Sequence, residues 1–185
     1  MLYASFIRPE GIYNSFFNKA AAFVTKGDFC HSEFIFKWSE EELQEILKRV
    51  KGCSKLKYHK GDINVCVYVI WGDKVRYRIL SDELPSNNPC DSFWRMPQND
   101  LIEVNTDWES EKNMFTWLMA QMGAPYDKTG AVLSVVPWRA KSSAYDKYFC
   151  SQLMCCALQR IGVMELYNPA SVSPNDLYRV LHTRA

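Results

Sequence analysis

Residues 148–158 read Tyr-Phe-Cys-Ser-Gln-Leu-Met-Cys-Cys-Ala-Leu, and the predicted fold is built around them. From Cys150 onward the apolar residues recur at the spacing of one buried helix face, and Gly162 is placed to end that helix. A thiol in a first helical turn lies near unpaired backbone N–H groups and the positive end of the helix dipole, and both favour the thiolate. Cys150 is therefore a candidate nucleophile, although a small buried hydrophobic residue would fit the same position.

Composition narrows the class of protein. The chain has 185 residues, of which 48% are hydrophobic, which predicts a single domain over residues 1–185. Its 22 basic and 21 acidic residues nearly cancel, so no overall charge favours nucleic acid. Seven cysteines without a Cys-x-x-Cys spacing argue against a disulfide framework and a zinc cluster. We expect no cofactor and no metal.

The distribution of apolar residues along the chain bears on where in the cell the protein is expected. The N-terminal segment has no basic region followed by an apolar one, and nowhere do 18 apolar residues run together. We therefore expect no signal peptide and no transmembrane segment. Together with the reduced thiols, this predicts a cytoplasmic or other reducing compartment.

A histidine and a carboxylate share one face of a predicted strand. Residues 30–38 alternate so that His31, Glu33 and Ile35 point to one side, and Ser32, Phe34 and Phe36 to the other. His31 is the best candidate base because His59 lies in a basic loop and His182 near the C-terminus. A core histidine and an ion-paired carboxylate are the plainer interpretations of His31 and Glu33.

The remaining periodicities predict an α+β fold with an antiparallel sheet or small barrel packed against helices. Strands are expected at 65–71 and 74–80, joined by a two-residue turn at Gly72-Asp73, and at 93–96 and 101–104. Helices are expected from Ile12 to Val24, ahead of the first strand, and after the caps Ser39, Thr106 and Ser173. A basic connection over 48–60 is interpreted as a solvated loop, or else as an anionic docking patch.

One family combines these features. The turn Gly123-Ala124-Pro125-Tyr126, a loop, and then Phe149-Cys150-Ser151-Gln152-Leu153 opening a helix resemble the surroundings of the nucleophile in NlpC-type papain-like thiol hydrolases. His31 precedes Cys150 here, which resembles the circularly permuted branch that includes lecithin:retinol acyltransferase-like and poxviral members. The strand His31-Ser32-Glu33 and the final Ser173-Pro174-Asn175-Asp176-Leu177 are similar to that branch too, so the resemblance covers about residues 6 to 182.

The resemblance implies a role for particular residues. Cys150 would be the nucleophile, His31 the general base and acid, and Glu33 the group that orients His31, with Asp62 or Asn64 as alternatives for that third role. Tyr126 would line the oxyanion side of the cleft, together with the Cys150 backbone N–H. Phe149 stands where the unpermuted branch often has aspartate, and Gln152 where permuted members often have glutamate. Residues 39–60 would be a helical insertion after the histidine strand.

Three functions follow as hypotheses. The first is a thiol hydrolase of amide or peptide bonds that passes through an acyl-enzyme. The second is a lipid ester hydrolase or acyltransferase of the same fold, which an exposed apolar patch beside the cleft would favour, with residues 131–138 as its candidate. The third is a non-catalytic interaction module, which a Cys150–His31 separation beyond hydrogen-bond reach would favour. Substrate bond type and partner proteins stay open.

Overall fold

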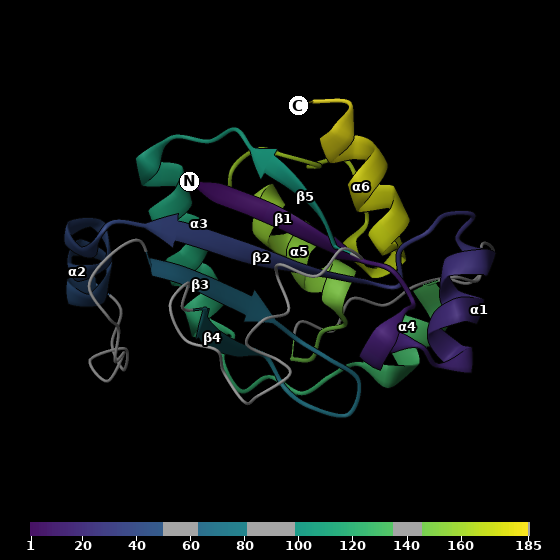
Figure 1. Cartoon of the computed structure of the whole chain (residues 1–185). Coiled ribbons are helices and arrows are strands. Elements are labelled where there is room, and N and C mark those ends of the chain that lie inside the picture. The colour runs from purple at the N-terminus through teal and green to yellow at the C-terminus, as the bar shows by residue number, and fades with distance from the viewer. Residues whose placement is uncertain (50–62, 81–98, 135–145, 185) are drawn as a thin grey trace.

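The computed structural model describes residues 1–49, 63–80, 99–134 and 146–184, and it has the expected α+β class (Figure 1). The described strands form one open antiparallel sheet in the order β4-β3-β2-β1-β5. Of the two predicted forms, the described strands make the antiparallel sheet and not the small barrel, because β4 and β5 lie at opposite edges. The strands are β1 (Leu2–Ile7), β2 (His31–Trp38), β3 (Ile63–Tyr68), β4 (Arg76–Leu80) and β5 (Asn99–Val104).

The N-terminal segment is a strand inside the sheet, which the sequence interpretation missed. β1 lies between β2 and β5, with Ile7 opposite His31 and Leu2 opposite Phe36. The expectation that a helix precedes the first strand was wrong. Nearly every residue of β1 is buried, so the segment lacks the alternation of polar and apolar residues that marks a half-exposed strand.

The connection between β3 and β4 is longer than predicted. Tyr68 pairs with Arg76, so residues 69–75 join the strands and the two-residue turn was wrong. The backbone of this connection bonds instead to the segment before the nucleophile. Val75 N–H donates to the Ala124 carbonyl at 2.8 Å, and Tyr126 N–H donates to the Asp73 carbonyl at 2.9 Å. The strand predicted at 93–96 lies outside the described residues.

Two helices cover one face of the sheet. α3 and α5 lie together behind it in Figure 1, and α5 contacts β2 more than any other element. Phe34 and Phe36 of β2 meet Leu153 of α5 in the core, where a fully buried side chain of this size contributes about 1.5–3 kcal/mol. The α-helices are α1 (Phe16–Val24), α2 (Glu40–Arg49), α3 (Trp108–Ala120), α4 (Lys128–Ser134), α5 (Cys150–Gln159) and α6 (Pro174–His182).

The first helix differs from its prediction in both start and orientation. It begins at Phe16 after a 3-10 turn, η1 (Gly11–Tyr13), because the Ser15 hydroxyl caps it by accepting from Asn18 N–H at 3.1 Å. The predicted apolar stripe faces outward. Phe16 is 90% exposed and Phe23 is 83% exposed, whereas the buried residue of α1 is the small Ala22.

Two of the three predicted helix caps are confirmed. Ser39 and Glu42 form a capping box ahead of α2, and Ser173 caps α6 with Pro174 in its first turn. The cap of α3 is Asp107 rather than Thr106, because the Asp107 carboxylate accepts from Ser110 N–H at 2.8 Å. Residues 50–60 of the predicted basic connection lie outside the described residues. Residues 135–138 of the candidate apolar patch, 131–138, do so as well.

Candidate functional site

Cys150 is the first residue of α5 and is 7% exposed. Its neighbours hold the helix start in place. Phe149 N–H donates to the Gln152 amide oxygen at 3.4 Å, and the Ser151 hydroxyl donates to the Val172 carbonyl at 2.7 Å. Gln152 thus closes the first turn of the helix. Because this turn is bonded on both sides, the direction of the Cys150 side chain is set by the backbone.

A short parallel bridge fixes the chain just before this helix. Tyr126 pairs with Tyr148, whose N–H donates to the Pro125 carbonyl at 3.1 Å. Asp127 N–H in turn donates to the Tyr148 carbonyl at 2.9 Å. The Gly123 backbone has φ +88°, a left-handed conformation that glycine adopts without strain. The Pro-Tyr turn therefore lies directly against the entry to α5.

His31 is the first residue of β2 and is 5% exposed. Its ring stacks on Tyr13, with centroids 5.2 Å apart and planes 19° from parallel. Beside it, the Cys30 N–H donates to the Ile7 carbonyl at 2.9 Å, which continues the pairing of β1 with β2. The imidazole is therefore positioned by the sheet on one side and by the 3-10 turn on the other.

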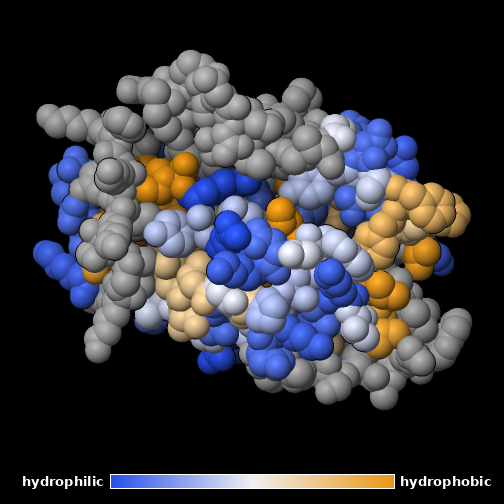
Figure 2. All heavy atoms as spheres, turned by 90° about the horizontal axis from the view of Figure 1, so that it is seen from below, coloured by the Kyte–Doolittle hydropathy of each residue, from blue (hydrophilic) through white to orange (hydrophobic). Residues whose placement is uncertain are grey.

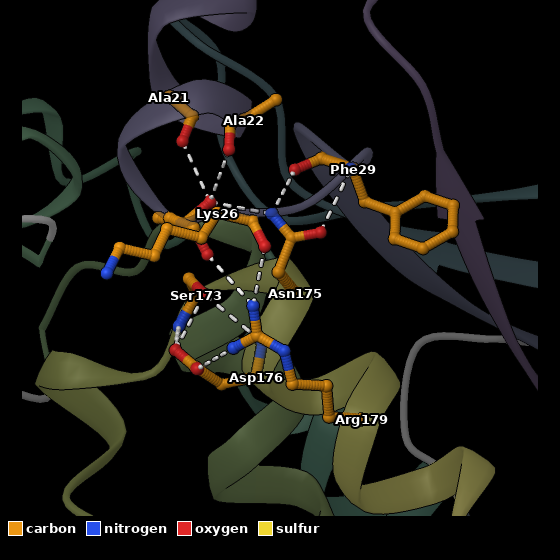
Figure 3. A network of polar contacts seen from close by, with 9 residues as sticks. Ala21, Ala22, Lys26, Phe29, Ser173, Asn175, Asp176 and Arg179 are labelled. Carbon is orange, nitrogen blue, oxygen red and sulfur yellow. Dashed lines mark hydrogen bonds and ion pairs between the residues drawn. The ribbon is translucent and has the colours of Figure 1, made fainter.

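The side-chain amide of Asn175, on α6, binds the loop that leads into His31 (Figure 3). The Asn175 side chain accepts from Phe29 N–H at 3.0 Å, and donates to the Phe29 carbonyl at 3.0 Å and to the Thr25 hydroxyl at 2.6 Å. A Cβ added at Gly27 would come within 2.2 Å of the Asn175 amide oxygen, so this approach requires glycine. Arg179 adds bonds to the Thr25 and Lys26 carbonyls.

Glu33 lies between His31 and an arginine. His31 Nε2 and Glu33 Oε2 are 3.6 Å apart, a distance for an ion pair rather than a short hydrogen bond. The other carboxylate oxygen accepts from Arg78 at 2.9 Å, and the Arg78 guanidinium also lies over the Tyr68 ring. Glu33 is 1% exposed. A buried carboxylate of this kind requires such partners.

Cys150 and His31 come within hydrogen-bonding reach of each other, and their pKa values move in opposite directions. Burial alone would raise the pKa of the Cys150 thiol, but the positive charge of His31, its hydrogen bond and the backbone N–H groups of Ser32 and Ser151 lower it. Burial would lower the pKa of His31, but the Cys150 thiolate and Glu33 raise it to about 9. Both shifts favour the Cys150 thiolate beside the His31 imidazolium.

The same network sets the state of Glu33. Burial would raise its pKa, yet the interaction with His31 and the charge of Arg78 hold it below the usual range. Because Glu33 faces Nε2 of His31, Nδ1 is the ring nitrogen that remains for the Cys150 sulfur. The three side chains thus run in the order thiol, imidazole, carboxylate, with Arg78 beyond them.

A small hollow with a volume of about 40 Å³ opens beside Cys150. Tyr126 lines it, and burial together with the negative charge of Cys150 raises the pKa of that phenol, which therefore keeps its proton. A protonated phenol and the Cys150 backbone N–H, the donor that the family resemblance implies, can both donate to a developing oxyanion. The other lining residues are mostly apolar or small: Phe17, Ala21, Thr25, Phe29, Cys30, Ala131, Ser134, Phe149, Ser173 and Pro174.

The structure brings together Cys150, His31, Glu33 and Tyr126, all four of the predicted site residues. It does not bring Asn64 to them. Asn64 lies opposite Lys37, at the far end of β2 from His31, which is about 20 Å away at the rise of a strand. Asp62 lies outside the described residues, as does His59.

Sequence reasoning missed three contributors to the site. Arg78 was noted only as a polar residue of a half-exposed strand, Tyr13 was not considered, and Asn175 was noted only as part of a helix start. Arg78 could have been found, since a buried carboxylate on one strand calls for a cation on a nearby strand. Nothing in the sequence points from Tyr13 to His31, because their contact depends on where η1 folds back.

Comparison of the chain with family models, with curated proteins and with solved structures found no match in any of the three. Within the described residues, no helix is long and apolar enough to cross a membrane. In the same residues, no group of three or more histidine, cysteine or acidic side chains is arranged to hold a metal ion.

Proposed function

We propose that the protein is a cysteine-dependent hydrolase of amide or peptide bonds, with Cys150 as nucleophile, His31 as general base and acid, and Glu33 as the residue that positions His31. The observation that carries the proposal is that Cys150, the first residue of α5, lies beside the buried His31 and Glu33 side chains and has a lowered pKa. This pairing supplies a nucleophile without an external base. It also argues against a non-catalytic module, which was expected to separate the two side chains.

The chemistry is a double displacement. The Cys150 thiolate attacks the carbonyl carbon, and the oxyanion faces the Cys150 backbone N–H and the Tyr126 phenol. The C–N bond breaks as the His31 imidazolium gives its proton to the leaving amine, which leaves a thioester on Cys150. The now neutral His31 takes a proton from water, the hydroxide attacks the thioester, and the C–S bond breaks. The carboxylic acid departs and the thiolate–imidazolium pair is restored.

Glu33 and Arg78 act on the base rather than on the substrate. The Glu33 carboxylate holds Nε2 of His31, and Arg78 keeps that carboxylate ionised at the pH where the enzyme works. The carboxylate therefore stabilises the imidazolium that the first step needs. Glu33 and Arg78 are positioning residues in this scheme, as the aspartate is in other triads.

The arrangement is consistent with the proposed membership of the circularly permuted NlpC-type branch of papain-like thiol hydrolases. A strand carries the histidine, a later helix carries the cysteine in its first turn, and a Pro-Tyr turn packs against that helix. These features, rather than chain order, define the geometry of such a site. α2, which follows the histidine strand, would be the start of an insertion in this family.

The proposal is tested by trapping the acyl-enzyme. Wild-type protein is mixed with pools of peptide, isopeptide and peptidoglycan amide substrates, quenched in acid, and measured by intact mass and peptide mapping. We expect the acyl group on the peptide that contains Cys150, and none in Cys150→Ser or His31→Ala. His182→Ala, which changes an exposed histidine of α6, is the matched control and should keep the acyl group. Turnover of lipid esters with no turnover of any amide would overturn the proposal.

A lipid ester hydrolase or acyltransferase is the second candidate, and one observation favours it. The hollow beside Cys150 is walled mainly by apolar side chains, including Phe17 of α1 and Ala131 of α4. Such walls suit an acyl chain better than a polar peptide. In this alternative the acyl thioester is the same, and the second step passes the acyl group to water or to another amine or alcohol. Mapping an acyl group from a phospholipid onto Cys150 would support it.

A further inference from the structure

The helix α1 has its polarity reversed relative to an ordinary surface helix. Its large apolar side chains Phe16, Phe23 and Val24 point away from the protein, whereas Ala22 faces the core. A surface helix usually buries such a stripe. Leaving a phenylalanine ring in water instead of burying it forgoes about 1.5–3 kcal/mol of stabilisation. Two nearly bare rings on one short helix therefore call for an explanation.

Exposed apolar side chains of α1 and of two neighbouring elements make up a surface that we name the α1 face. The ring of Phe17 is 4.5 Å from that of Trp71, in the connection between β3 and β4, and Val132 is exposed on α4, whose Ala131 lines the same hollow as Phe17. Figure 2 shows hydrophobic side chains protruding at the end of the molecule that carries α1. The α1 face consists of Phe16, Phe17, Phe23, Val24, Trp71 and Val132.

Lysines surround this surface. Lys19 and Lys26 are exposed on α1 and directly after it, and Lys128, exposed at the start of α4, lies 5.9 Å from the centre of the Trp71 ring. Of the nearby carboxylates, Asp73 pairs with Arg76 and Asp127 with Lys147, and the exposed Asp28 after α1 is outnumbered by the three lysines. The net charge at the border of the α1 face is therefore positive, although the whole chain is almost neutral.

We propose that the α1 face docks on the surface of an anionic lipid bilayer. An interfacial helix combines phenylalanine and tryptophan on its apolar side with lysines beside them, and the charges add attraction to anionic lipid headgroups. The rings of Phe16 and Phe23 protrude rather than line a groove, so they insert between lipids without a preformed pocket. Docking of this kind brings the hollow beside Cys150 to the bilayer, because α1 and α4 form both surfaces.

The docking does not depend on the chemistry at Cys150, so it is tested with full-length Cys150→Ser protein and vesicles. Flotation is measured with phosphatidylcholine vesicles and with vesicles that contain phosphatidylserine as well. We expect flotation with the anionic vesicles, little with the neutral ones, and a fall as salt is raised. The double variant Phe16→Ser/Phe23→Ser should bind anionic vesicles at least about tenfold less.

The matched control is Leu101→Ser, which removes an exposed aliphatic side chain on the edge strand β5. It should float like the parent protein, and circular dichroism should show that all variants are folded. Equal flotation of the double variant and its parent would overturn the proposal, as would failure of the parent to float with anionic vesicles. A dimer in light scattering that is lost in the double variant, without vesicle binding, would assign the α1 face to a second copy and would also overturn it.

Discussion

Two cysteines on the same helix have opposite chemistry. Cys150 and Cys156 of α5 are both buried, at 7% and 5% exposed, and each borders a hollow. The pKa of Cys150 is lowered, whereas burial raises that of Cys156 to about 11 even though Arg160 is nearby. The difference lies in direct contact with His31 and in the backbone N–H groups of the first turn. Burial raises the pKa of Cys156 more than the charge of Arg160 lowers it, so Cys156 is not expected to be a nucleophile.

The largest expected effect separates these two thiols by substitution. Cys150→Ser should lower turnover by at least about 10³-fold, because a serine hydroxyl is not ionised by this histidine at neutral pH. Cys156→Ser should leave kcat/KM within about threefold of wild type, since Cys156 lies on the second turn and away from His31. Initial rates on a substrate that forms the acyl-enzyme measure both variants. Equal loss in the two variants would remove the distinction between them.

The second largest effect is expected for His31, whose contact with Cys150 distinguishes the two thiols. His31→Ala should lower kcat by about 10²–10⁴-fold, because no side chain then stabilises the thiolate or gives a proton to the leaving amine. His182→Ala should change neither kcat nor KM. Thermal melting in parallel shows whether each variant is folded. Turnover by a folded His31→Ala variant at the wild-type rate would show that another group is the base.

Removing the charge of Glu33 should have a smaller effect on rate and a clear effect on pH dependence. Glu33→Gln should lower kcat about 10–100-fold, and the upper limb of the kcat/KM profile should move to lower pH, because the pKa of His31 is no longer raised by a carboxylate. Glu45→Gln, which alters the partly exposed partner of Lys112, is the control and should leave the profile unchanged. An unmoved upper limb in Glu33→Gln would mean that Glu33 does not act on His31.

Stability should follow the same groups. The pKa of His31 is raised from 6.5 to about 9, so its contribution to stability is complete below about pH 6.5 and is lost as pH rises through 9. The pKa of Glu33 is lowered from 4.5, so its contribution is present above about pH 4.5 and is lost as pH falls through its lower folded value. Melting temperatures of wild type and His31→Ala across pH 4–10 should converge only at the alkaline end.

The smallest effect on rate is expected at the support of the histidine strand. Asn175→Ala removes three buried hydrogen bonds to Phe29 and Thr25, and should lower the free energy of unfolding by about 1–3 kcal/mol. Turnover should fall by less than about tenfold, since His31 keeps its pairing within the sheet. Asn168→Ala, which removes a side-chain bond to Ala170, is the control and should leave the rate unchanged. Chemical denaturation and kcat measurements compare the two.

The sequence predicted the parts of the fold that follow a simple period. The helix from Cys150 and the strand from His31 were found because their apolar residues recur at 3.6 and 2 residues and their ends have clear caps or breakers. β1 was missed because its six residues, Leu2–Ile7, show no alternation of polar and apolar side chains. The turn at Gly72 was predicted too tightly, because the backbone there pairs with residues 124–126, which no local pattern shows.

The site was predictable only as far as residue types allowed. A cysteine at a helix start and a histidine with a glutamate on one strand face are visible in the sequence, and the structure brings them together. Arg78 and Tyr13 complete the surroundings of the pair through contacts between distant segments. The orientation of α1 was unpredictable for a different reason, since an apolar stripe does not say whether it faces the core or the outside.

The measurement that tests the central claim most directly is the rate at which iodoacetamide alkylates each cysteine as pH is raised. Peptide mapping gives the rates separately for Cys150 and Cys156, in wild type and in His31→Ala. We predict that Cys150 reacts at least about tenfold faster than Cys156 at pH 7, and that His31→Ala removes this advantage. Equal rates for the two thiols at pH 7 in the folded wild-type protein would contradict the thiolate–imidazolium pair.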